Sequence, residues 1–197
     1  CACFGATNSN SVLCMLWCQA QFHAQPFLLY NVDIPWKEDE SMIISLAAGL
    51  SLDNDLQANI NSMEKILAAA KAESSDLVLF GEAFLQGFGA ITFDYEHDIK
   101  HVALGVYSPE IASVRQLAAK YELGVGFGFF ENNHSGIFAT YLIVDAAGKT
   151  VGKYQRVSPG AWIPEANAEY RLGKEFHVFD FAGKRFALLV CGDFWED

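Results

Sequence analysis

The alternation of amphipathic helical patterns with short apolar runs constrains the fold of this chain most strongly. Residues 53–73 repeat apolar side chains at helical spacing, and residues 76–82 contain a continuous apolar run of strand length. Such a strand is buried on both faces, so its sheet needs a covering layer on each side. The pattern therefore predicts an α/β layered domain.

Further elements of the same kind make the predicted sheet partly antiparallel. Two segments have the form of hairpins, because each joins two apolar runs through an Ala-Gly turn. Ser108 and Pro109 begin a second helix as N-cap and first helical residue. The expected elements are a strand at 42–49, a helix at 108–121, a Gly-rich strand at 122–131, and hairpins at 136–157 and 175–191.

The ends of the chain differ from its middle. Residues 1–41 are poor in charge, rich in Cys, Gln and Phe, and begin with Cys, so we predict an atypical N-terminal extension without an assigned function. Residues 42–197 form the predicted α/β domain. Its last strand ends at Cys191, where open α/β sheets normally continue with helix, so we expect this domain to be incomplete at its C-terminus.

The charge balance excludes two classes of partner. The formal net charge is -11, from 24 acidic and 13 basic residues. Nucleic acids and anionic membranes are bound through clustered Lys and Arg, so neither is expected as a partner. The apolar run at 11–20 is too short to span a bilayer. No basic residue precedes Lys37, so a secretory signal is not indicated, and we predict a cytoplasmic protein.

The cysteines and histidines do not form a recognisable metal motif. Cys14 and Cys18 share a helical spacing, but only His23 lies near them as a further ligand. A disulfide would need an oxidising compartment, and small buried hydrophobes remain the simpler interpretation. Phosphate-loop and dinucleotide fingerprints are missing from the sequence. We therefore predict no metal and no cofactor.

Two predicted strands end on reactive residues. Glu82 ends the segment 76–82, just after its apolar residues, and Cys191 ends the run at 184–191. Ligand sites in α/β sheets lie beyond the carboxyl ends of strands, so these side chains can converge, together with Arg156 from a third strand. Taken singly, they are a buried cysteine, a capping acid and a surface charge. Their common placement at strand ends favours a site.

Three segments carry a family resemblance. "FGEAFLQGF", "GKYQRVSPGAW" and "LLVCGDFWED" resemble the signature segments of the nitrilase (carbon–nitrogen hydrolase) superfamily, over about residues 42–197. The resemblance implies an α-β-β-α sandwich with mixed sheets. It also implies hydrolysis of non-peptide carbon–nitrogen bonds in a small amide or carbamoyl compound through a cysteine thioester, without a cofactor. A homo-oligomer is implied for the full-length protein.

The resemblance assigns roles to individual residues. Glu82 matches the general base and Cys191 the nucleophile, while Gly192 matches the residue whose N–H helps to bind the oxyanion. Glu165 matches an assisting carboxylate, with Glu169 close by as an alternative. These residue types suit the chemistry, because a carboxylate can accept the thiol proton and a backbone N–H can stabilise the tetrahedral oxyanion.

One position departs from the family pattern. Arg156 stands where the family typically has lysine, and it keeps the positive charge but cannot release a proton near neutral pH. Lys153 is three residues earlier on the same strand, so it should face the opposite side of the sheet. Trp162 is a candidate substrate-binding residue, with core packing as the alternative.

Two other functions stay open. The Arg156 departure fits a catalytically impaired relative that serves as a binding or scaffold protein. The stretch "CGDFW" also fits a glutaminase-type domain that supplies ammonia to a synthetase.

Overall fold

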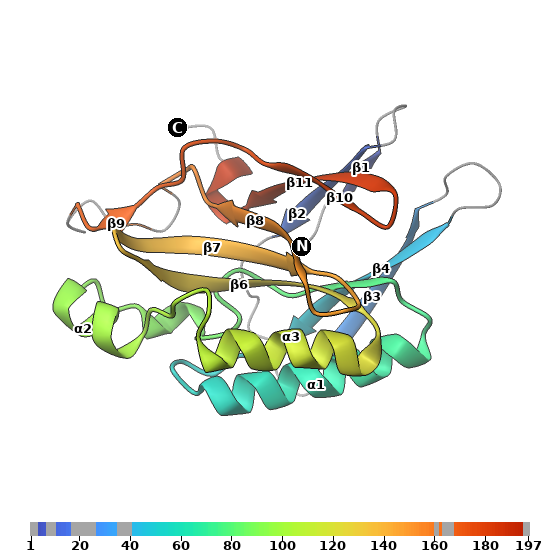
Figure 1. Cartoon of the computed structure of the whole chain (residues 1–197), viewed down its shortest axis with the longest axis horizontal. Coiled ribbons are helices and arrows are strands. Elements are labelled where there is room, and N and C mark those ends of the chain that lie inside the picture. The colour runs from blue at the N-terminus through green and yellow to red at the C-terminus, as the bar shows by residue number, and fades with distance from the viewer. Residues whose placement is uncertain are drawn as a thin grey trace.

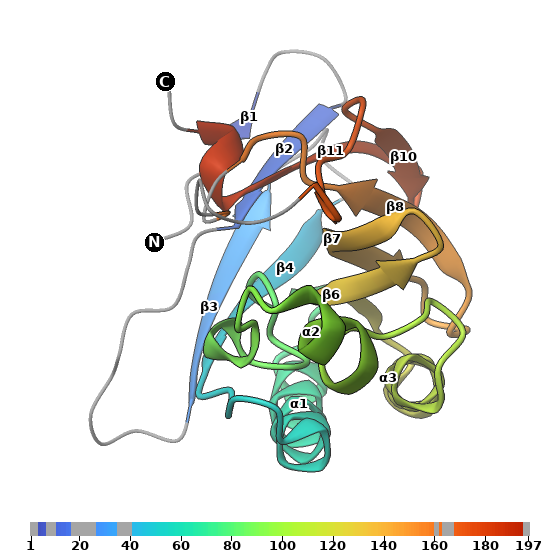
Figure 2. The same ribbon diagram turned by 90° about the vertical axis from the view of Figure 1, so that its left-hand side faces the viewer.

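The computed structural model describes residues 4–6, 11–16, 27–34, 41–159, 162 and 168–194, with side chains from residue 41 onward. It has a layer of helices, a large mixed sheet and a smaller mixed sheet stacked in that order (Figures 1 and 2). The α/β class with mixed sheets is therefore confirmed. The second helical layer of an α-β-β-α sandwich is not among the described residues.

The larger sheet has the strand order β3-β4-β5-β6-β7-β8, and β9 pairs with β7. Strands β4, β5 and β6 run parallel to each other, whereas the pairs β3–β4, β6–β7 and β7–β8 are antiparallel. Strand β9 pairs parallel with β7. The strands are β3 (Phe27–Ile34), β4 (Met42–Gly49), β5 (Leu77–Leu79), β6 (Gly124–Asn133), β7 (Gly136–Val144), β8 (Thr150–Gln155) and β9 (Tyr170–Arg171).

The smaller sheet has the order β1-β2-β11-β10. Its members are β1 (Phe4–Ala6), β2 (Ser11–Leu16), β10 (Val178–Phe181) and β11 (Lys184–Val190). The predicted N-terminal extension thus supplies β1 and β2 to this sheet and β3 to the larger one. That the segment has no assigned function, and that the domain begins at residue 42, stay predictions.

Two helices cover the outer face of the larger sheet. They are α1 (Leu56–Ala72), capped by the Asp55 side chain, and α3 (Pro109–Tyr121), capped by Ser108 as expected. Their apolar stripes pack on the sheet through buried residues that include Met63, Ile66, Val114, Phe127 and Leu142. Within the described ranges, no helix combines the length and hydropathy that a membrane span requires.

The space between the two sheets holds a second core. Leu79 and Tyr141 from the larger sheet pack against Phe186 and Leu188 of β11, and Tyr154 of β8 closes the cluster. Both faces of the larger sheet are thereby buried, which explains the continuous apolar runs in its central strands. The reactive residues lie where this inter-sheet core ends.

The sequence patterns did not reveal α2 (Tyr95–His101) and the 3-10 turns η1 (Phe88–Ala90) and η2 (Cys191–Phe194). Helix α2 has seven residues, too few to show an apolar period. The Asp94 side chain caps it, and the buried Asp98 anchors it by tertiary contacts. Short elements of this kind depend on distant partners more than on local pattern.

Candidate active site

Glu82 lies in the loop that follows β5, and its side chain is only 3% exposed. The loop is fixed on both sides of the carboxylate. The Tyr141 hydroxyl donates to the carbonyl of Phe80 at 2.7 Å. The Gln86 amide bonds both main-chain polar groups of Phe130, at 3.0 and 3.1 Å. Residues that are distant in the sequence thus hold the Glu82 loop beyond the end of β5.

Gly128 of β6 allows this loop to lie against the strand. A Cβ at position 128 would stand 2.7 Å from the Cα of Glu82 and 2.6 Å from the nitrogen of Ala83. The glycine N–H donates to the carbonyl of Gly81 at 3.2 Å, and its carbonyl accepts from Leu85 at 3.2 Å. Ala83 has a φ of 50°, in the left-handed region that non-glycine residues adopt at a cost of about 1 kcal/mol.

Arg156 follows β8 and is 2% exposed. Its Nη1 donates to Glu82 Oε1 at 2.5 Å. Its Nε and Nη2 donate to the carbonyls of Ser158 and Pro159, at 3.1 and 2.6 Å. The Trp162 ring lies over the guanidinium, 5.1 Å from Cζ to the ring centre. A buried cation with this many partners keeps one fixed orientation.

Cys191 opens η2 directly after β11, and its φ of 48° is again left-handed. Asp193 in the same turn clamps the end of β11 to the end of β8. One of its oxygens accepts from the Val190 N–H at 2.8 Å and from the Tyr154 hydroxyl at 2.6 Å. The other accepts from the Ser158 N–H at 3.0 Å. The strained cysteine position is thus held by bonds from both sheets.

Arg156 and Cys191 both interact electrostatically with Glu82. Burial raises the pKa of Glu82 above its ordinary value, while the charge of Arg156 and a hydrogen bond from Cys191 act in the opposite direction. Glu82 Oε2 is buried, and no nitrogen or oxygen donor of the described residues contacts it. The carboxyl therefore has one oxygen bound by Arg156 while it accepts a bond from the thiol, as a general base for a cysteine requires.

The other predicted residues have different outcomes. Gly192 is buried in η2 next to Cys191, and its role at an oxyanion stays a prediction. Trp162 contacts Arg156, and its indole donates to the carbonyl of Arg171 at 3.3 Å. Glu165 lies outside the described residues, as do the side chains of the cysteines and the histidine that precede residue 41.

Lys153 faces the other side of β8 from Arg156, as its offset of three residues predicts. It pairs with Glu131 Oε1. Thr140 and Gln155 donate to the second oxygen of Glu131, at 2.7 and 2.9 Å. Lys153 therefore does not contact Glu82. No group of three or more metal-binding side chains occurs in the described part of the chain.

Sequence reasoning did not identify the residues that orient the reactive groups. Asp193 and Tyr154 lie within the quoted segments, but their contact joins strands that are distant along the chain. Their proximity in sequence to Cys191 and Arg156 is the one signal that could have pointed to them.

The family model for carbon-nitrogen hydrolase matches residues 45–196. More than half of the chain is matched, so the protein belongs to the carbon-nitrogen hydrolase family, the nitrilase superfamily that the sequence segments resemble.

Curated relatives and solved structures agree with this membership. An arylacetonitrilase of Aspergillus niger is 28% identical over 53% of this chain and 34% of its own length. A bifunctional nitrilase/nitrile hydratase of Lupinus angustifolius is 28% identical over 73% of this chain and 44% of its own. The chain thus spans less than half the length of these two relatives.

An amidase from Nesterenkonia sp. has the same fold, with a TM-score of 0.64 and 21% identity, over 76% of this chain and 55% of the amidase. Variants of that amidase have been solved in complex with acrylamide and with an acetamide moiety added covalently at the active-site cysteine.

Proposed function

We propose that this protein hydrolyses the carbon–nitrogen bond of a small amide or carbamoyl compound through a thioester on Cys191. The observation that carries the proposal is the contact of Glu82 with both Arg156 and Cys191 at the ends of three strands. A thiol alone is mostly protonated at neutral pH and attacks poorly, so a neighbouring base is the feature that distinguishes a nucleophile from a buried cysteine.

The reaction proceeds in two halves. Glu82 takes the thiol proton as Cys191 Sγ attacks the carbonyl carbon, and a tetrahedral oxyanion forms. The oxyanion collapses with cleavage of the carbon–nitrogen bond, and Glu82 gives its proton to the departing amine or ammonia. Water then attacks the thioester, losing a proton to Glu82, and the acid leaves as the thiol is restored.

Arg156 supplies positive charge beside this chemistry without exchanging protons. Three of its five N–H groups donate to Glu82, Ser158 and Pro159, so at most two remain for a substrate oxygen. The Gly192 N–H is the second proposed donor, and each such donor lowers the barrier by about 3 kcal/mol in a dry site. Glu165 is the proposed assisting carboxylate.

Small amides are the favoured substrate class for two reasons. The amidase with the shared fold binds acrylamide. The described residues also bring the Glu82–Arg156 pair and the Cys191 thiol together at the edge of the core between the two sheets. A small, uncharged carbonyl compound fits such a site better than a polymer does. Because two of the relatives are nitrilases, small nitriles belong in the assay as a comparison class.

The test is a panel of small amides, carbamoyl compounds and nitriles, read by ammonia release from the full-length native protein. Cys191→Ala should reduce turnover by about 10³-fold or more, because no other group can form the thioester. Its thermal midpoint should stay close to that of the unsubstituted protein. Ser113→Ala on α3 is the control, since Ser113 bonds only its own helix in the described structure. Undiminished turnover by Cys191→Ala would refute the proposal.

The impaired-relative alternative has one observation in its favour, which is that two main-chain carbonyls and Glu82 already occupy three of the five N–H groups of Arg156. It predicts that the unsubstituted protein releases no ammonia from any member of the panel. It also predicts that Arg156→Lys gains or alters activity. Detection of a thioester on the Cys191 peptide by mass spectrometry would decide against this alternative.

A further inference from the structure

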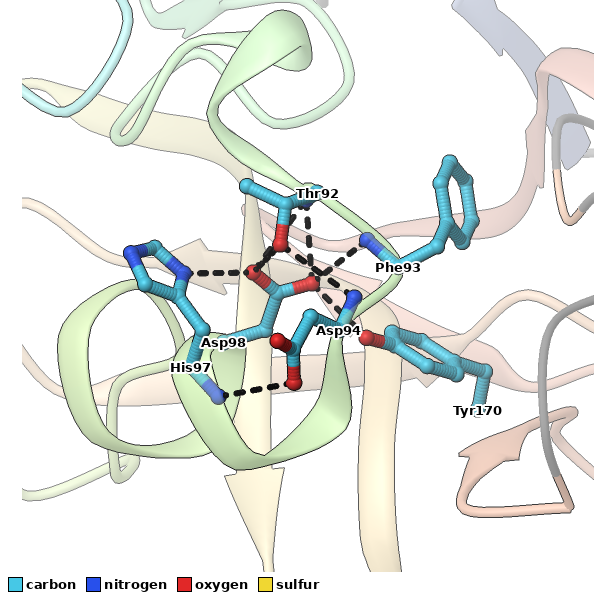
Figure 3. A network of polar contacts seen from close by, with 6 residues as sticks. All are labelled: Thr92, Phe93, Asp94, His97, Asp98 and Tyr170. Atoms are coloured by element: carbon cyan, nitrogen blue, oxygen red, sulfur yellow. Dashed lines mark hydrogen bonds and ion pairs between the residues drawn. The ribbon is translucent and has the colours of Figure 1, made fainter.

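Asp98 of α2 is a fully buried carboxylate that lies outside the proposed reaction. Figure 3 shows the polar contacts around it. Its Oδ2 accepts from the N–H groups of Thr92 and Phe93, at 3.0 and 2.9 Å, and from the Tyr170 hydroxyl at 2.7 Å. Its Oδ1 accepts from the Thr92 hydroxyl at 2.6 Å and contacts His97 Nδ1 at 3.1 Å. Burial acts to raise the pKa of Asp98, but these hydrogen bonds outweigh it and hold the pKa below the ordinary value.

Two of these donors belong to aromatic residues, and the rings of both contact a third aromatic ring. Phe93 and Tyr170 have ring centres 5.5 Å apart, and Trp162 lies 6.0 Å from the first ring and 5.5 Å from the second. We call Phe93, Trp162 and Tyr170 the aromatic cluster. Phe93 has a left-handed φ of 63°, and its N–H bond to Asp98 holds that strained backbone in place.

The aromatic cluster ends on Arg156. Trp162 covers the guanidinium at 5.1 Å and donates to the carbonyl of Arg171, the residue after Tyr170. The Gly173 N–H donates to the Arg156 carbonyl at 2.7 Å, so the segment after β9 also holds the arginine main chain. Contacts therefore run without a gap from the carboxylate of Asp98 to the guanidinium that binds Glu82.

We propose that Asp98 is a positioning residue that acts on Arg156 through the aromatic cluster. The proposal rests on the proposed function, since it concerns the orientation of the same guanidinium. The bonds of Asp98 anchor α2, which Asp94 also caps, but anchoring a helix does not require the partner to be an aromatic residue that packs against Trp162. The tyrosine bond instead crosses from α2 to β9, the strand that carries the support for Trp162.

The central test is Tyr170→Phe, which removes only the hydroxyl that Asp98 binds. We expect kcat to fall about five- to tenfold with KM changed less than twofold, because a looser Arg156 loses transition-state stabilisation more than substrate binding. Trp162→Leu should cause a larger loss of the same kind. In the double variant, Tyr170→Phe should add little to the loss from Trp162→Leu, because its effect passes through that ring.

A second measurement does not depend on turnover. The rate of iodoacetamide alkylation at Cys191, followed by peptide mass spectrometry, should change at least threefold in Tyr170→Phe and in Asp98→Asn. Tyr95→Phe is the matched control. It removes a hydroxyl from a ring that touches Tyr170, at 6.3 Å between centres, without removing the bond to Asp98.

Val114→Ala controls for stability alone, since it opens a cavity in the helical layer away from the aromatic cluster. The proposal is overturned if Tyr170→Phe lowers the thermal midpoint as Val114→Ala does while kcat and the alkylation rate stay unchanged. Additive losses in the double variant would overturn it as well. If no substrate is turned over, the proposed function fails, whereas the alkylation rates still decide whether Asp98 is coupled to the cysteine.

Discussion

Glu82 and Glu131 are two buried carboxylates, and each pairs with a cation near the C-terminal end of β8: Arg156, which directly follows the strand, and Lys153 within it. Glu131 is bound by Lys153, Thr140 and Gln155, so both of its oxygens have conventional donors. Glu82 has a guanidinium on one oxygen, and no nitrogen or oxygen donor of the described residues contacts the other. The difference separates a carboxylate that stabilises the fold from one that can still accept a proton.

The two pairs also lie on opposite faces of one strand. Glu131 lies on the same face of β6 as Phe127 and Phe129, which pack against the helices. Arg156 lies on the same side as Tyr154, toward the smaller sheet. Cys191 packs against the cluster on this second face. Lys153 of β8 therefore pairs with Glu131 on one face, whereas Arg156 pairs with Glu82 on the other, at the position where the family resemblance implies lysine.

The largest expected contrast is between Glu82→Gln and Glu131→Gln. We expect Glu82→Gln to lower kcat about 10²- to 10⁴-fold, since an amide cannot accept the thiol proton. Glu131→Gln should instead lower the free energy of unfolding by about 2 kcal/mol, because it weakens a charge-assisted network, and should change kcat only a few-fold. Urea unfolding and ammonia release measure both variants. Equal losses of kcat would remove the distinction between the two pairs.

Arg156→Met tests the cation of the first pair and its effect on pH dependence. Glu82 must be ionised to act as base, so kcat/KM should rise with pH through its raised pKa. Arg156 lowers that pKa, so its removal should move the acid limb of the profile to higher pH. We also expect kcat to fall about 10²-fold.

Arg156→Lys keeps the charge and serves as the matched variant, so its acid limb should stay near that of the unsubstituted protein. Arg156→Met leaves Glu82 buried without its cation, which can prevent folding. In that case Arg156→Lys alone tests the role of the charge. An acid limb that moves to lower pH in either variant would contradict the assigned direction.

Gly128→Ala tests the close approach that places Glu82. The added Cβ would lie 2.6–2.9 Å from main-chain atoms of residues 81–83, so the loop must shift. A displacement of about 1 Å lowers turnover about 10²-fold, and overpacking costs about 1–3 kcal/mol. Gly105→Ala is the control, because nothing lies within 4 Å of a Cβ there. Identical kinetics for the two alanine variants would show that the approach is not needed.

Lys153→Met should have the smallest effect. Its side chain is 35% exposed, so the loss of the ion pair should cost about 1 kcal/mol of stability, and kcat should stay within twofold. Thermal unfolding and the ammonia assay measure the two quantities. A large loss of kcat would mean that the lysine of β8 takes part in catalysis after all.

The helices and strands of the domain were predictable because their signals are local. Apolar period and capping residues located α1 and α3, and Ala-Gly turns located the hairpins β7–β8 and β10–β11. The strand-end position of Glu82 and Cys191 was predictable for the same reason. Helix α2 was not, because a seven-residue helix has no visible period and depends on the bonds of Asp98.

The sequence by itself determined that Glu82 and Cys191 lie just beyond strand ends, because the apolar runs stop there. Only the tertiary structure decided how they are held. Three contacts join residues of different strands and loops: the bonds of Asp193, the close approach of Gly128 to the Glu82 loop, and the separate ion pairs of Arg156 and Lys153. Local patterns describe the faces and ends of elements, whereas the partner of a buried charge is set by how those elements pack.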